Sequence, residues 1–184
     1  MVIRRFNATT GNPPANTFEQ CLEPHLHHLY QLAFRFCNNQ ADAEDLVQDV
    51  VIKLLPRTNE MSQIEKLRPW LAKVLYRQFI DRYRQQSRSP LSLIADGDDL
   101  LTEHADPSGE TPETHAEADF SQKRLSAALQ TLNEDQRAVV LLHDVEGYTL
   151  SELENILDSP QGTLKSRLNR ARTQLREYLQ KMDK

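Results

Sequence analysis

The stretch from Gly147 to Arg172 is the feature that most narrows the folds open to this chain. Its first half carries apolar residues at helical spacing, namely Leu150, Leu153, Ile156 and Leu157. The triplet Asp158-Ser159-Pro160 interrupts this pattern, and a second helical period follows at once. Ser159 is a favoured N-cap residue and Pro160 suits the first helical position, so the second helix is expected to begin at Pro160.

The second helix of this pair is apolar on one side and basic on the others. Its apolar stripe consists of Leu164, Leu168, Ala171 and Leu175. Its basic residues are Lys165, Arg167, Arg170, Arg172 and Arg176. A basic helix entered through a tight turn is typical of the helix-turn-helix, in which the second helix reaches base edges in the major groove. A helical hairpin with a solvated basic face is the alternative, but turn, cap and charge together favour DNA binding.

Charge is distributed unevenly along the chain, although the formal net charge is only −5. Residues 67–90 carry six basic and one acidic side chain, and residues 161–184 carry seven and two. Residues 91–120 carry nine acidic side chains and no Lys or Arg. Attraction to phosphates depends on such local clustering, so two separate contacts with nucleic acid are predicted.

Five glycines in 184 residues and long amphipathic periods predict an all-α protein. The pattern divides the chain into a flexible N-terminus (1–16), a first helical domain (17–88), an acidic linker (89–116) and a second domain of four helices (117–184). In the second domain, Asn133 is expected to cap a helix and Gly147 to end it in a left-handed conformation.

The first domain is expected to contain three long helices. The second of them, about Asp42 to Leu55, carries an acidic face that is either solvated or a docking surface. Its carboxylates lack an apolar pocket or a catalytic partner, so the chain is not expected to be an enzyme.

The third helix, from Arg68 to about Gln86, interleaves aromatic and basic residues. They are Tyr76, Arg77, Phe79, Arg82, Tyr83 and Arg84. Aromatic side chains at helical spacing are commonly core residues, but beside arginines they can also stack on unpaired bases while the cations hold the backbone. Both readings stay open on the residues alone.

No metal or other cofactor is expected. Cys21 and His25 are one helical turn apart, but no second cluster completes a tetrahedral site. Two cysteines are too few for a disulfide framework, and no apolar run near the N-terminus suggests a signal peptide or a membrane span. A cytoplasmic protein is therefore predicted.

Several segments resemble the sigma factors of bacterial RNA polymerase, specifically the extracytoplasmic-function (ECF) class. Residues 132–137, 144–148 and 162–172 are similar to region 4 of that family. Residues 42–50 resemble region 2.2, and Pro69-Trp70-Leu71 through Arg84 resembles regions 2.3 and 2.4. The resemblance implies a protein that binds core RNA polymerase, takes it to promoters and opens the DNA, under the control of an anti-sigma factor.

The resemblance also implies roles for particular residues. The helix-turn-helix would read the minus-35 element with Gln161, Thr163, Lys165, Ser166, Arg167 and Arg170. The third helix would engage and melt the minus-10 element with Tyr76, Arg77, Arg82, Tyr83 and Arg84. The polymerase would be bound by Asp42, Asp45, Gln48 and Asp49, and the acidic linker would follow the polymerase's RNA path.

Four positions depart from the pattern of that family. Asn133 stands where proline is usual, Glu154 where a small residue is usual, Asp158 where glycine is usual, and Arg77 where asparagine is common. Glu154 is expected either to lie exposed or to pair with Arg167 or Arg170. Arg77 leaves the preferred base of the melted element open.

Two other functions fit parts of the pattern. A stand-alone helix-turn-helix regulator would bind its operator without polymerase, usually as a dimer, but gives no role to the acidic helix or to the first basic segment. A protein-interaction module would use both helical units to bind a regulator.

Overall fold

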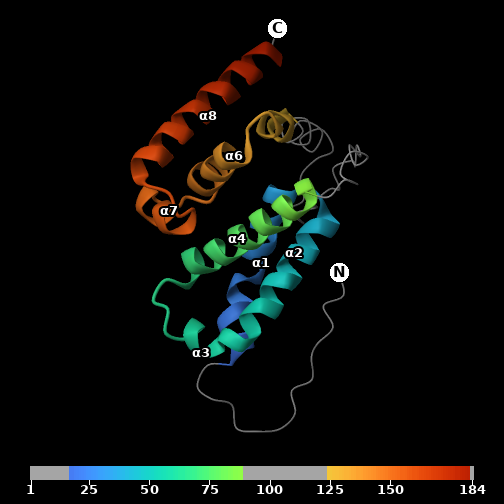
Figure 1. Cartoon of the computed structure of the whole chain (residues 1–184), viewed down its shortest axis with the longest axis vertical. Coiled ribbons are helices and arrows are strands. Elements are labelled where there is room, and N and C mark those ends of the chain that lie inside the picture. Colours follow the sequence, from blue (N-terminus) through green and yellow to red (C-terminus); the bar gives the residue numbers. More distant parts are fainter. Residues whose placement is uncertain (1–16, 89–123, 183–184) are drawn as a thin grey trace, which may run out of the picture.

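The computed structural model describes residues 17–88 and 124–182. Within these two stretches every regular element is a helix, which confirms the all-α prediction. Figure 1 shows two groups of helices, one from each stretch, that lie against each other. The expected N-terminal segment 1–16 and linker 89–116 lie outside the described residues.

The first group consists of α1 (Phe18–Cys37), α2 (Gln40–Leu54), η1 (Leu55–Arg57), α3 (Thr58–Met61) and α4 (Leu67–Arg88). Local rules set the first two boundaries. Thr17 and Gln20 form a capping box that begins α1. Asn38, with φ of 53°, ends α1 in a left-handed conformation, and the Asn39 side chain then accepts the backbone N–H of Asp42 to begin α2.

The three long helices of this group pack against one another. Their fully buried leucines are Leu29, Leu32, Leu46, Leu54, Leu71 and Leu75. Burying each such side chain stabilises the fold by about 1.5–3 kcal/mol before conformational entropy is counted. This packing fixes the outward faces of α2 and α4.

The second group contains a helical segment at 124–130, then α6 (Glu134–Val140), the π-helical stretch η3 (Leu141–Val145), α7 (Leu150–Ile156) and α8 (Gln161–Met182). Asn133 caps α6 in a capping box with Gln136, as predicted. Gly147 has a φ of 75°, as predicted for a residue just beyond a helix.

The predicted start of α8 is wrong in detail. The helix begins at Gln161, and Pro160 contributes the carbonyl that accepts the N–H of Leu164. The hydroxyl of Ser159 donates to Leu157 O and accepts a bond from Arg167. The Ser159 hydroxyl therefore forms hydrogen bonds that stabilise the turn, and it does not cap α8.

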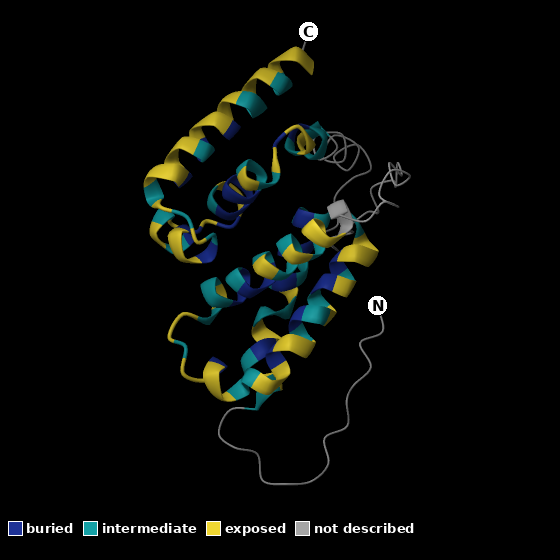
Figure 2. Ribbon diagram, in the orientation of Figure 1, coloured by how far each residue is buried: buried dark blue, intermediate teal, exposed yellow. Residues whose placement is uncertain are grey.

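The two groups share one hydrophobic core. Its buried residues run without interruption from α1, α2 and α4 into α6, α7 and α8. Tyr148, on the loop before α7, is only 4% exposed and joins this core. Figure 2 shows buried residues on the facing sides of the helices and a largely exposed outer side of α8.

Candidate nucleic-acid interface

The helix-turn-helix places its basic helix on the surface. α7 is fixed to α8 through Leu153, Ile156 and Leu164, all of which are buried. The turn between them passes through Asp158, which has a φ of 48°. Because the apolar stripe of α8 faces inward, the residues between its members are turned to solvent.

Four of the six residues predicted to read the minus-35 element are exposed on α8: Thr163, Lys165, Ser166 and Arg170. The other two are partly buried and held by neighbours. Gln161 donates to the Glu154 carboxylate at 2.9 Å. Arg167 pairs with Asp135 at 2.6 Å and donates to Ser159 at 3.3 Å.

Glu154 forms no ion pair with either of the two expected arginines. It is exposed and bonds to Gln161, not to Arg167 or Arg170. A carboxylate at this position is tolerated because α7 turns it outward, away from the contact with α8. The first of the two expectations, an exposed side chain, therefore holds.

The aromatic residues of α4 divide between core and surface. Phe79 stacks on Phe36 of α1 with ring centroids 5.0 Å apart, and Tyr76 lies 5.9 Å from the same ring. Burial raises the pKa of Tyr76 to about 12. Tyr83 is 41% exposed and its hydroxyl bonds to Glu134 of α6. Tyr83 is thus the most exposed of these three aromatic residues.

The arginines predicted for the minus-10 contact have different partners. Arg77 donates to Asp158 at 2.7 Å, across the boundary between the two helix groups. Arg82 pairs with Asp49 at 2.5 Å and donates to the carbonyl of Asp45. Arg84 is exposed. The basic face of α4 and the acidic face of α2 are therefore joined at Arg82.

On α2, Asp42, Asp45 and Gln48 are exposed, while Asp49 is partly buried by its bonds to Arg82 and Gln78. Sequence reasoning missed the apolar residues beside them. Ile52 is 71% exposed and Leu55 is 59% exposed. Ile52 follows Gln48 by four residues and so lies on the same face of the helix, a position off the core stripe that could have signalled it. Exposed apolar residues rimmed by carboxylates are typical of a protein-binding surface.

Glu146 is the centre of a polar cluster between the helix groups. Its side chain is 4% exposed and pairs with Arg35, with Arg68 at 3.4 Å and with His28 at 3.1 Å. The hydroxyl of Tyr148 lies 3.0 Å from the same histidine. Burial is the largest influence on the pKa of His28 and lowers it. The charge of Glu146 acts in the opposite direction, while Arg68 and Arg35 lower the pKa further.

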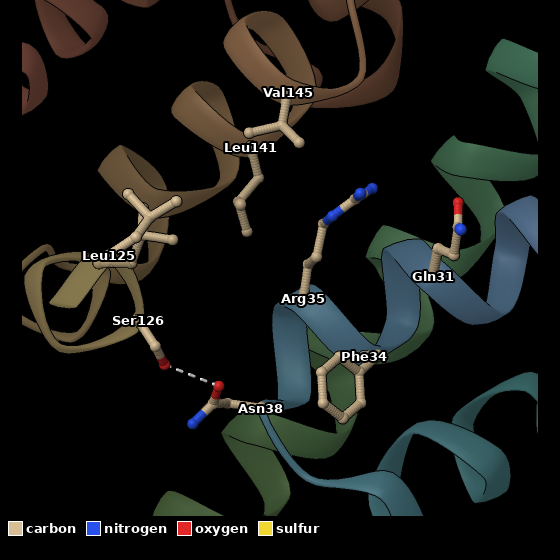
Figure 3. Close-up of a pocket in the computed structure, with 9 residues that line it drawn as sticks. Gln31, Phe34, Arg35, Asn38, Leu125, Ser126, Leu141 and Val145 are labelled. Atoms are coloured by element: carbon tan, nitrogen blue, oxygen red, sulfur yellow. Dashed lines mark hydrogen bonds between the residues drawn. The ribbon is translucent and has the colours of Figure 1, made fainter. Parts of the chain in front are cut away.

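A pocket of about 390 Å³ lies beside this cluster, between α1 and the second helix group. Figure 3 shows Phe34 and Arg35 on one side and Leu125, Leu141 and Val145 on the other. A hydrogen bond of 3.0 Å from Ser126 to Asn38 crosses one end.

Among residues 17–88 and 124–182, no three His, Cys, Asp or Glu side chains lie close enough together to hold a metal ion. In the same two stretches, no helix has both the length and the apolar character needed to span a bilayer. Burial raises the pKa of the Cys37 thiol to about 12, which favours its protonated form at neutral pH.

Comparison with known proteins identifies both helix groups. Residues 21–89 match the family Sigma-70 region 2, and residues 122–175 match Sigma-70, region 4. The ECF RNA polymerase sigma factor SigE of Mycolicibacterium smegmatis is 33% identical over 177 residues, which cover 96% of this chain and 66% of that one. RNA polymerase sigma factor SigV of Bacillus subtilis is 30% identical over 163 residues, covering 89% and 91% of the two chains.

A solved structure agrees with the sequence relatives. The sigma factor RpoE from Bartonella quintana, solved in complex with the anti-sigma factor NepR, superposes with a TM-score of 0.71. It has 26% sequence identity, and the match covers 89% of this chain and 96% of that one. The regions, relatives and fold lead to one conclusion: this chain belongs to the ECF sigma factors, non-enzymatic proteins that bind RNA polymerase and direct transcription initiation through regions 2 and 4.

Proposed function

We propose that this chain directs RNA polymerase to its promoters by reading the minus-35 element with the exposed face of α8. The observation that carries the assignment is the position of Lys165, Ser166 and Arg170, which are exposed in the first half of the second helix of a helix-turn-helix. In this motif those positions enter the major groove. Gln161 and Arg167 would also contact DNA after breaking their bonds to Glu154 and Asp135, respectively. Arginine can donate two hydrogen bonds to one guanine.

For the minus-10 element we propose α4 as the contact. Arg84 and Tyr83 offer a cation and an exposed ring for an opened strand, while Arg77 and Arg82 hold the backbone. Tyr76 supports this face from within the aromatic cluster with Phe36. The acidic linker 89–116 separates this unit (17–88) from the helix-turn-helix unit (117–184).

The surface proposed for the polymerase is the outer face of α2. Asp42, Asp45 and Gln48 supply its polar rim, and Asp49 lies at the edge of this surface beside Arg82. Exposed Ile52 extends this face with apolar area that a partner would cover. A protein that works on RNA polymerase acts where transcription takes place, so we place it in the cytoplasm.

Control by an anti-sigma factor is proposed from the match to a sigma factor solved with such a partner. Its test is purification of the tagged chain from its own cells, followed by identification of the proteins bound in stoichiometric amounts. Recovery of polymerase subunits alone, under both growth and stress, would argue against an anti-sigma partner.

The function is tested by transcription with purified core polymerase on a promoter selected from random DNA by the reconstituted holoenzyme. Lys165→Ala should weaken binding of that promoter and reduce the slope of log affinity against log salt by about 1, because one phosphate contact is lost. The matched control is Lys181→Ala, which removes the same charge from the same helix near its far end.

The control separates a DNA contact located in the first half of α8 from general attraction by the charge of the helix. Lys181→Ala should leave both affinity and transcription close to those of the unmodified protein. Equal losses in the two variants would assign α8 to non-specific attraction. Tight binding of a duplex without polymerase, with no promoter-dependent transcript, would support a stand-alone regulator instead.

A further inference from the structure

The pocket between α1 and the second helix group has no part in the proposed contacts with DNA or polymerase. Its volume of about 390 Å³ lies within the range of roughly 300–1,000 Å³ that small-molecule sites occupy. The described residues that line it include none of those proposed to bind DNA or polymerase. The pocket is therefore a separate candidate site, and its lining decides which class of ligand fits.

The walls of this pocket expose apolar area. Leu125 is 47% exposed and Val145 is 46% exposed, and both line the pocket. Phe34 and buried Leu141 extend the same lining, as Figure 3 shows. Two exposed large apolar side chains in one concave site leave area that an apolar ligand would remove from water.

Arg35 is the single charged side chain among the described residues that line the pocket. Its side chain is 35% exposed. The Nη1 group donates to Glu146, while Nε and Nη2 donate to no acceptor within residues 17–88 and 124–182. Because a guanidinium carries five N–H donors, Arg35 keeps donors for a second anion.

The polar cluster beside the pocket carries an excess of positive charge. Arg35 and Arg68 share the one carboxylate of Glu146, so two cations face a single anion. His28 adds little charge at neutral pH, because burial lowers its pKa. The Glu146 side chain is 4% exposed, and charges removed from water in this way are screened less than surface charges. The excess therefore favours an anion beside Arg35.

We propose that this pocket binds an amphipathic monoanion, a carboxylate with an unbranched apolar tail. The carboxylate pairs with the Arg35 guanidinium through charge-assisted N–H bonds. The tail lies against Leu125 and Val145 and covers their exposed area. A small hydrophilic anion such as phosphate would leave both of these side chains in water.

The test titrates the full chain with sodium octanoate below its micellar concentration and follows amide NMR shifts. Octanoate should bind saturably and shift the amides of the residues that line the pocket. Hexanoate should bind about tenfold more weakly, since each methylene removed from water is worth about fourfold in affinity. Octylamine, which has the same tail and the opposite charge, should give no saturable shifts at these amides.

Two variants place a carboxylate in the apolar wall, namely Leu125→Glu and Val145→Glu. Both side chains are partly exposed, so the fold should be kept, and the amide spectrum away from the pocket checks this. Each variant should abolish saturable binding of octanoate. Met182→Glu is the matched control, because it also replaces an exposed apolar side chain with Glu but does not line the pocket. It should bind octanoate as the unmodified protein does.

Three outcomes would overturn the proposal or one part of it. Absence of saturable shifts with octanoate would overturn the site as a whole. Unchanged binding in both wall variants would overturn its location. Equal binding of octylamine and octanoate would overturn the pairing of an anion with Arg35. The proposed role in transcription depends on none of these results, because its surfaces do not include the pocket.

Discussion

Glu146 is a single residue that contributes strongly to the packing of region 4 against region 2. Its carboxylate is almost fully removed from water, and an unpaired charge in such a place would cost several kcal/mol. Arg35, Arg68 and His28, all from region 2, compensate for that cost. The buried carboxylate is therefore stabilised only while region 4 stays packed against region 2.

Replacing Glu146 with Gln should destabilise the protein by about 1–2 kcal/mol, less than for a fully buried pair because Arg35 and Arg68 are themselves partly exposed. The measurement is the free energy of unfolding in urea. Asp144→Asn is a suitable control, since it breaks the more exposed pair with Arg172 inside region 4. Equal stability of Glu146→Gln and the unmodified protein would show that the cluster does not contribute to the closed arrangement.

At the scale of elements, α7 depends on its cap. A helix of seven residues does not persist alone in water, so it is held by the burial of Leu153 and Ile156 and by a capping box. The Glu152 carboxylate accepts the N–H of Thr149 at 2.9 Å and its hydroxyl at 2.8 Å. These bonds favour the ionised form and lower the pKa of Glu152 below its usual 4.5.

The cap should give α7 a measurable pH dependence. Because the folded-state pKa of Glu152 is the lower one, its stabilising effect is complete above pH 4.5 and is lost as the pH falls through the folded-state value. Unfolding free energies of the unmodified protein and Glu152→Gln should therefore differ at pH 7 and converge in acid. In a Thr149→Ala background this difference should shrink at every pH, and a difference of the same size would refute the role of the cap.

The elements also show which features sequence can predict. Asn133 and Gly147 behave as predicted because their roles depend on the next few backbone groups. Ser159 does not, because the distant guanidinium of Arg167 competes for its hydroxyl.

In the candidate site too, features set by neighbouring residues can be predicted from the sequence, whereas contacts between distant residues cannot. Exposure of Lys165 and Arg170 follows from helical periodicity, a local property. The pairing of Arg77 with Asp158 joins residues 81 positions apart, and no periodicity contains that information. Ile52 was missed because an isolated apolar residue off the core stripe looks the same in sequence whether it is covered or exposed.

At the scale of the whole molecule, the two clusters between the regions differ in their contact with solvent. The Asp158 side chain is 54% exposed, whereas that of Glu146 is 4% exposed. Dissolved salt screens exposed charges far more strongly than buried ones. The regions are thus joined by one contact that responds to ionic strength and one that does not.

The free energy of unfolding should reveal this difference when NaCl is raised from about 0.05 M to about 0.5 M, a range over which the screening length falls severalfold. The loss of stability caused by replacing Asp158 with Asn, which removes the charge that pairs with Lys73 and Arg77, should shrink as the salt rises. The loss of stability caused by Glu146→Gln should be similar at both salt concentrations, because this side chain is 4% exposed. If salt removed both differences equally, the assignment of a screened and an unscreened contact would be wrong.

The π-helical stretch Leu141–Val145 sets the direction in which this interface faces. There the N–H of Glu146 bonds to Leu141 O, five residues back, so the turn holds one residue more than an α-helical turn. Each residue of an α-helix rotates the chain by about 100° about the helix axis. The extra residue therefore rotates all the residues that follow it relative to a regular α-helix. Removing a single residue from this stretch would turn Glu146 and Tyr148 away from α1 without altering either side chain. The contact between the two regions therefore depends on the number of residues in this stretch as well as on the charged side chains.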